Sequence, residues 1–111
     1  MELITWADFE KIELRVGAIL AVDDFPEARK PAYKLTLDFG EFGTRRSSAQ
    51  ITEHYTTEQL VGKQVLAVLN FPTKQIGKFF SECLTTGVPD ELERVVLVSP
   101  DIKVPNGAKL F

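Results

Sequence analysis

Chemically reactive side chains are scarce in this chain of 111 residues. Cys83 is the only cysteine and His54 the only histidine. An intramolecular disulfide is therefore impossible, and a cysteine zinc site lacks ligands, so we expect no metal. Because the chain also has no Gly-x-Ser-x-Gly elbow and no phosphate-binding glycine loop, we expect no cofactor and no enzymatic activity. A His54–Cys83 dyad would still need a third group to orient it, so we predict a solvated loop histidine and a buried, apolar cysteine.

Long apolar stretches are also missing. None approaches the roughly 18 residues that span a bilayer, so we expect no membrane insertion. Residues 1–8 lack the basic start and apolar run of a signal peptide, which makes the cytoplasm the expected compartment. An apolar fraction of 44% with 26% charged residues is typical of a globular protein, and the length predicts a single domain over residues 1–111.

What the chain does have is a series of strand patterns. Residues 33–39 alternate between apolar and polar side chains. Their predicted inward-facing residues are Tyr33, Leu35, Leu37 and Phe39. The aliphatic segment 14–22 contains Gly17, which we expect to mark the bend of a barrel strand. A glycine-bounded turn at 40–43 predicts an antiparallel partner strand after it. The further strands are expected at 44–49, 63–70, 82–85 and 94–98.

Two short helices are predicted from their capping signals. One runs from Thr5 to Lys11 and the other from Thr56 to Leu60, and in each the threonine is followed three residues later by a side chain that completes a capping box. Gly62 is expected to end the second helix. The C-terminal tail is too apolar to stay free, so we expect it to dock. This order of elements predicts an all-β fold, a five-stranded OB-fold barrel with short helices and N- and C-terminal extensions.

Positive charge is concentrated in the middle of the chain. Residues 44–78 contain five lysines and arginines against two glutamates, a net charge of +3, whereas the whole chain carries −3. An anionic ligand would be attracted here. The candidate RNA-binding residues are Arg45, Arg46, Lys74 and Lys78, with an exposed aromatic such as Phe71 available to stack on a base. The alternative is that these are ordinary solvated charges.

The segment 70–80 combines large apolar side chains with amides around Pro72 and Gly77, residues that break regular structure. An extended peptide needs apolar pockets for its side chains and polar groups for its backbone, because an unpaired buried amide costs about 1–3 kcal/mol. The candidate peptide-binding residues are Gln50, Asn70, Phe71, Ile76 and Phe79. The alternative is that the phenylalanines belong to the core or to a dimer contact.

Several motifs resemble the tRNA-binding domain family. In chain order they are Ile12–Gly17, Leu60–Lys63, the residues Asn70, Ile76, Gly77 and Ser81-Glu82, and finally Val104–Gly107. Residues 25–35, 47–52 and 70–72 are similar to its CsaA branch, the protein-export chaperones. The resemblance covers nearly the whole chain.

This resemblance implies an OB-fold barrel that forms a homodimer, with the N-terminal helix and the C-terminal segment at the interface. It also implies a chaperone that binds unfolded polypeptides and preproteins through an apolar pocket and contacts the export ATPase of the secretion machinery. The alternative function is tRNA binding on the basic face of the same fold.

Overall fold

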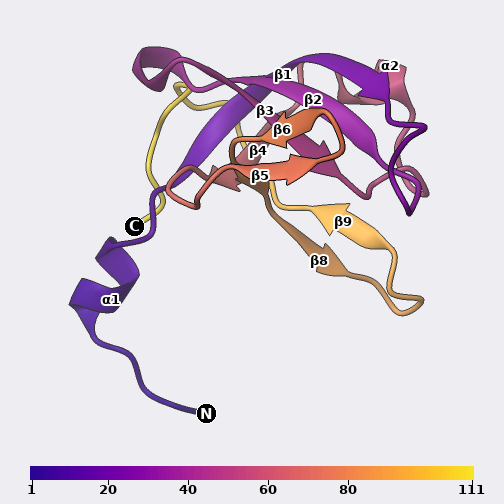
Figure 1. The fold of residues 1–111 in the computed structure, drawn as a ribbon. Helices are drawn as coiled ribbons and strands as arrows, with labels where there is room; N and C mark the ends of the chain where they lie inside the picture. Colours follow the sequence, from indigo (N-terminus) through magenta and orange to yellow (C-terminus); the bar gives the residue numbers. More distant parts are fainter.

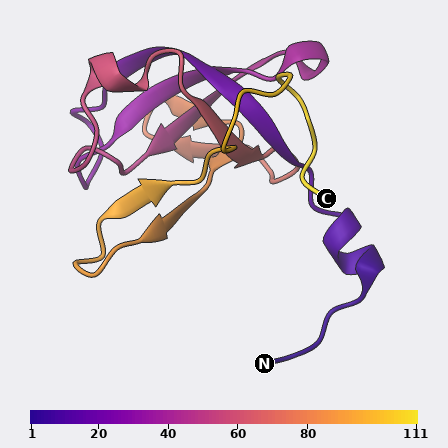
Figure 2. The ribbon, with the colours of Figure 1, turned by 180° about the vertical axis from the view of Figure 1, so that it is seen from behind.

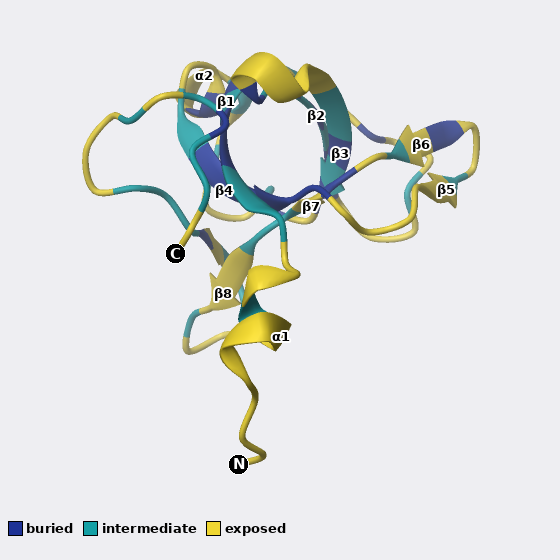
Figure 3. Cartoon of the chain, turned by 90° about the vertical axis from the view of Figure 1, so that its left-hand side faces the viewer, coloured by how far each residue is buried: buried dark blue, intermediate teal, exposed yellow.

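A five-stranded antiparallel sheet, coiled into a barrel, forms the body of the computed structural model, which describes all 111 residues (Figure 1). The strand order is β3-β2-β1-β4-β7. The strands are β1 (Leu14–Asp24), β2 (Tyr33–Asp38), β3 (Thr44–Ala49), β4 (Gln64–Val68) and β7 (Leu84–Thr85). Figure 3 looks into the ring that they make. The predicted all-β, five-stranded OB-fold barrel is confirmed.

β1 is shared between the two halves of the barrel. Its first half, Leu14–Ala18, pairs with β4, and its second half, from Ala18 onward, pairs with β2. The register with β2 is irregular around Leu20, whereas we expected the distortion at Gly17. Gly17 serves another purpose, because a Cβ there would come within 2.5 Å of the Phe39 ring. The glycine therefore makes room for a fully buried core side chain.

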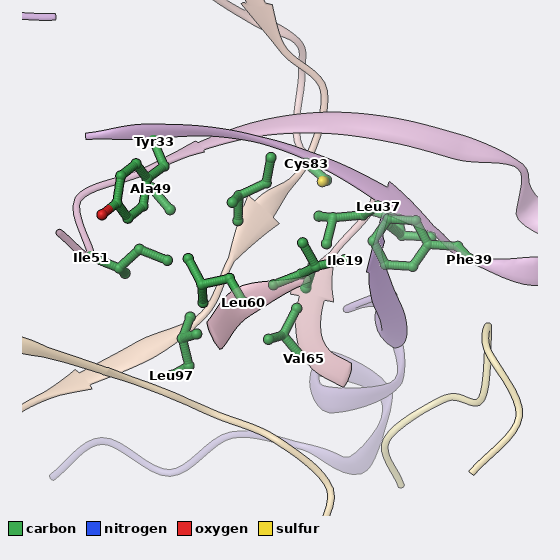
Figure 4. Packing of buried hydrophobic residues seen from close by; sticks show 13 residues of the cluster. Ile19, Tyr33, Leu37, Phe39, Ala49, Ile51, Leu60, Val65, Cys83 and Leu97 are labelled. Atoms are coloured by element: carbon green, nitrogen blue, oxygen red, sulfur yellow. The ribbon is translucent and has the colours of Figure 1, made fainter. Parts of the chain in front are cut away.

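The core fills the barrel with side chains from β1, β2, β3 and β4 and from the segments that connect the strands. The alternation predicted for β2 is confirmed, since all four expected inward residues are buried. Figure 4 shows three of them, Tyr33, Leu37 and Phe39, in one cluster with Ile19, Leu60 and Val65. Cys83 lies in the same cluster, as expected for a small apolar residue. The inner face of the barrel is thus closed to ligands, which leaves its outer faces and loops for function.

Both predicted helices are present with their capping boxes. α1 (Trp6–Glu10) is capped by Thr5, and α2 (Thr57–Leu60) is capped by Thr56 between β3 and β4. α2 inserts Leu60 into the core, whereas α1 buries none of its residues and stands away from the barrel (Figures 1 and 2). A single turn of 3₁₀ helix, η1 (Gly40–Phe42), joins β2 to β3. No helix of the structure has both the length and the apolar composition needed to cross a membrane.

Two hairpins extend from the barrel. β5 (Lys74–Ile76) pairs with β6 (Phe79–Ser81), and β8 (Gly87–Pro89) pairs with β9 (Val95–Leu97). The sequence patterns indicated only an irregular segment over the first hairpin and no strand at β8, while the strand expected at 94–98 corresponds to β9. Gly77 provides the turn of the first hairpin with a φ of 62°. Figure 2 shows the second hairpin projecting from the barrel.

The C-terminal segment docks on β1, as predicted. Val16 donates its amide hydrogen to the carbonyl of Ala108 at 2.9 Å, and Leu110 donates to Leu14 at 2.8 Å. The guanidinium of Arg15 stacks 4.0 Å from the centre of the Phe42 ring and donates to the carbonyl of Gly107. These contacts hold the end of the chain beside the start of β1.

Candidate functional site

The largest concentration of predicted site residues lies on the outer face of β2 and β3. Alternation along these strands turns Lys34 and Arg46 outward, because their neighbours in each strand point into the core. The loop 25–32 and the β5–β6 hairpin both border this face, and they meet where Phe25 packs on Phe79. Three adjoining cavities of about 430, 320 and 370 Å³ follow this face. We call them together the binding groove.

The first part of the groove, the basic cavity, has an aromatic floor. The rings of Phe25 and Phe79 lie 5.3 Å apart with an interplanar angle of 59°. The Arg46 guanidinium lies 4.7 Å from the centre of the Phe79 ring, and Lys34 Nζ lies 4.9 Å from the centre of the Phe25 ring. Lys78 also lines this cavity of about 430 Å³. Cations over ring faces are attracted to them, so the rings help to position positive charge at the groove.

The second part, the apolar cavity, lies at the base of the β5–β6 hairpin. It has a volume of about 320 Å³ and is lined by Phe71, Ile76 and Leu84 among others. Phe71 is 56% exposed, so its ring is available to a ligand. Ile76 also lines the third cavity, of about 370 Å³, together with Gln50. The structure therefore brings three of the five predicted peptide-binding residues to two neighbouring cavities.

The other two predicted peptide-binding residues are engaged inside the protein. Phe79 is only 6% exposed and packs with Phe25. Asn70 accepts a hydrogen bond from the amide of Glu13 at 3.0 Å and donates one to the carbonyl of Lys11 at 2.7 Å. Its amide thus connects the end of β4 to the segment that follows α1, and both of its polar groups are occupied.

Three of the four predicted RNA-binding residues lie at the groove. Arg46 and Lys78 belong to the basic cavity, and Lys74 lines the other two cavities. Arg45 turns to the opposite face and donates to the carbonyl of Leu69 at 2.9 Å, in agreement with the alternation of a strand. Sequence reasoning missed Lys34, although its position between two inward-facing residues of β2 was a signal for an outward cation.

A polar connection holds the hairpin against the edge of β3. Arg46 donates its amide hydrogen to Glu82 Oε1 at 3.0 Å, and Ser48 donates to Ser81 Oγ at 3.2 Å. The amide of Glu82 in turn donates to the carbonyl of Arg46 at 2.8 Å. These three hydrogen bonds take the place of a regular strand ladder between β3 and the hairpin. They therefore fix the position of the hairpin that borders the groove.

Cys83 and His54, the two residues considered for a catalytic dyad, are each engaged elsewhere: the cysteine is buried and the histidine contacts Asp90. Burial raises the pKa of the Cys83 thiol to about 12, which suppresses the reactive thiolate. His54 Nε2 lies 2.8 Å from Asp90 Oδ2, at the turn between β8 and β9. The predicted loop histidine is exposed, yet it is held in an ion-pair geometry rather than free.

The comparisons with known proteins agree on one family. Residues 14–109 match the family described as "Putative tRNA binding domain". The methionine–tRNA ligase of Methanococcus aeolicus is 36% identical over 110 residues, which cover 99% of this chain but 16% of the ligase. That of Pyrococcus horikoshii is also 36% identical, and the match covers 15% of its length. The chain therefore spans only a small part of these curated relatives.

Solved structures match over their whole length. The CsaA chaperone of Picrophilus torridus is 48% identical with a TM-score of 0.90, and the match covers 98% of this chain and 100% of that one. The CsaA chaperone of Bacillus anthracis is 44% identical with a TM-score of 0.93, covering 99% and 100%. The family is a binding domain and not a catalytic one. This chain belongs to the tRNA-binding domain family, in its CsaA branch.

Proposed function

We propose that this protein is a chaperone that binds unfolded preproteins in the binding groove and delivers them to the export ATPase in the cytoplasm. The observation that carries the proposal is the apolar cavity, where an exposed Phe71 stands beside Ile76 and Leu84. The similarity to solved structures named as CsaA chaperones supports it. The groove then holds its ligand without converting it to a product.

The chemistry of the groove fits an extended polypeptide. Full burial of a leucine or phenylalanine side chain stabilises a complex by about 1.5–3 kcal/mol, and the cavities at Phe71 and Ile76 each have the volume for one such group. The ligand's backbone needs polar partners. The side-chain amide of Gln50 makes no hydrogen bond within the chain and lines the cavity next to Ile76. Gln50 is therefore the best placed group to pair with a bound backbone.

The proposal includes a homodimer. The N-terminal segment exposes Leu3, Ile4 and Trp6, and the five-residue helix α1 buries none of its residues. So short a helix is marginal in water without a packing partner. A second copy that covers this segment supplies that partner. Light scattering at micromolar concentration should give a dimer mass, and Trp6→Ser should shift it toward the monomer; a wild-type monomer mass rules the dimer out.

A second candidate function is tRNA binding, favoured by the basic cavity. Lys34, Arg46 and Lys78 converge there, with Glu27 as the only acidic lining residue. Phosphate contacts of this kind make affinity fall as salt rises, by about 0.7 log units per decade of salt for each contact to a single strand. Apolar burial has no such dependence. Salt therefore separates the two functions.

Fluorescence anisotropy of a labelled, unfolded preprotein segment tests the first function. Phe71→Ser should weaken binding about tenfold, which corresponds to about 1.4 kcal/mol. The matched control is Leu92→Ser, because Leu92 is 71% exposed but lies on the loop between β8 and β9. It should leave affinity unchanged. If both variants bind as the wild type does, the apolar cavity is not the peptide site.

The same titration with labelled tRNA tests the second function. Lys78→Glu should weaken tRNA binding and lower its salt dependence. Lys103 is exposed and lies outside the groove, so Lys103→Glu should have little effect on the affinity or on its salt dependence. Tight, salt-sensitive tRNA binding without any peptide binding would move the function to tRNA recognition.

A further inference from the structure

The barrel is open along one seam, between the end of β3 and the start of the β8–β9 hairpin. At the end of the β2–β3 ladder Phe39 donates its amide hydrogen to the carbonyl of Gly43, and the alternation that this sets turns the backbone groups of Arg46 and Ser48 away from β2. The carboxylate of Glu82 accepts the amide hydrogen of Arg46, and the hydroxyl of Ser81 accepts the amide hydrogen of Ser48. Past these contacts, the amide hydrogen and the carbonyl of Gln50 have no hydrogen-bond partner in the chain.

The opposite side of the seam also presents free backbone groups. Thr86 donates to the carbonyl of Leu66, and its own carbonyl accepts from Val98. By the alternation of an antiparallel ladder, the backbone groups of the flanking Thr85 and Gly87 point the other way, toward β3. One side-chain contact crosses the seam, a 2.9 Å hydrogen bond from Thr85 Oγ1 to Ser47 Oγ.

A cavity of about 430 Å³ occupies this seam, and its lining is uncharged. Gln50, Thr85 and Gly87 form its rims, and Ile51, Val95 and Leu97 are among its apolar lining residues. Ser48 and Leu84 line both this cavity and the apolar cavity, so the seam continues the binding groove. A ligand in the groove can therefore run on into the seam.

We propose that the seam binds an extended, uncharged stretch of polypeptide by backbone pairing, as an added strand. The free groups of Gln50, Thr85 and Gly87 supply the hydrogen bonds of such a strand. Its apolar side chains pack on Val95 and Leu97. A nucleic acid is excluded by the absence of any cation in the lining, since phosphate contacts dominate its affinity. This inference rests on the proposed chaperone function and specifies how its substrates are recognised.

Amide hydrogen exchange by NMR tests this recognition mode. The probe is an acetylated and amidated peptide of alternating valine and serine, and the control is the same peptide with methylated backbone nitrogens, which cannot donate to a strand. The amides of Gln50, Thr85 and Gly87 should exchange rapidly in the free protein and at least about tenfold more slowly with the probe. The methylated peptide should give much weaker protection of these amides.

The other outcomes overturn the proposal in distinguishable ways. If the probe binds but protects only amides around Phe71, the seam is not a binding site while the chaperone function stands. If no unfolded peptide binds anywhere, both fail together. Protection that grows with protein concentration alone would assign the seam to a second copy of this chain. Protection by an RNA oligonucleotide at the same amides would likewise contradict a polypeptide site.

Discussion

The ring of Phe25, in the loop between β1 and β2, lies 5.3 Å from the ring of Phe79 at the start of β6. Together with Ala32 these residues form a small cluster that is separate from the barrel core. The cluster holds the β5–β6 hairpin against the barrel and so sets the shape of the binding groove. The groove therefore depends on a packing contact whose rings lie beneath the cations Lys34 and Arg46.

Phe79→Ala should therefore release the hairpin. Loss of a buried phenylalanine costs about 3–5 kcal/mol in a main core, and we expect about 3 kcal/mol here because the cluster is small. Denaturant unfolding followed by circular dichroism measures the change. Phe80→Ala is the matched control, since Phe80 is 53% exposed, and it should change stability by less than about 0.5 kcal/mol. Equal effects of the two changes would contradict the role of the cluster.

Gly17→Ala should destabilise the barrel by about 1–3 kcal/mol, because the added methyl group overlaps the ring of Phe39. Thermal unfolding of the single variant measures this loss. The double variant Gly17→Ala with Phe39→Leu should recover part of it, since the smaller side chain removes the overlap. Additive losses in the double variant would show that the ring is not the cause.

Asn70→Ala should loosen α1 while leaving the barrel folded. The change removes the hydrogen bonds to Lys11 and Glu13, a loss of about 1 kcal/mol for each, and releases the segment between α1 and β1. Limited proteolysis should then cut this segment faster than in the wild type. Gln75→Ala, which loses one exposed side-chain bond to Gly77, is the control and should be cut at the wild-type rate. An unchanged cutting rate in the first variant would argue against the anchoring role.

The carboxylate of Asp90 should make the stability of the β8–β9 region depend on pH. Burial alone raises its pKa, but hydrogen bonds from His54, Arg94 and the amide of Leu92 outweigh this and hold the pKa well below its ordinary value of about 4. A lowered folded-state pKa means that the ionised form adds stability above pH 4 and that this stability is lost as the pH falls below it.

Asp90→Asn should therefore lower the melting temperature by a few degrees at pH 7, and the difference from the wild type should shrink on acidification below pH 4. Thermal melts across pH 3–7 measure it. Asp101→Asn, an exposed aspartate without an ion pair, should show no such convergence. A gap that stays constant with pH would contradict the assignment.

Cys83 should resist thiol reagents in the native protein. Burial holds its thiol pKa at about 12, so at pH 8 only about one molecule in ten thousand carries a thiolate. A chromogenic disulfide reagent should react slowly until denaturant is added, and then quickly. Fast reaction of the folded protein would mean that the thiol opens to solvent.

Local patterns in the sequence were enough to predict most of the strands and helices of the barrel. The alternation of residues 33–39 predicted which side chains enter the core, because successive side chains of a strand point to opposite faces. Thr5 and Thr56 predicted two helix starts, because a capping box is formed within four residues. The motifs of residues 12–17 and 60–63 led to the family. These features depend on neighbours close in the chain.

The sequence analysis proposed residues 70–80 and Gln50 as ligand-binding, and this stays a prediction. The structure does place Phe71, Ile76 and Gln50 at neighbouring cavities. Asn70 and Phe79 appeared equally suitable by residue type. Their partners, Lys11 and Phe25, lie more than 50 residues away in the chain, so no local pattern could show that they were already engaged.

By itself, then, the sequence determined the strands of the barrel, the helix caps, the family and the basic middle segment. Only the tertiary structure decided which cations share a face, that Lys34 joins Arg46 over two phenylalanine rings, and that a seam remains between β3 and β8. The physical reason is that strand and cap signals arise from interactions over a few residues. A groove, by contrast, is made by segments that meet only when the sheet coils into a barrel.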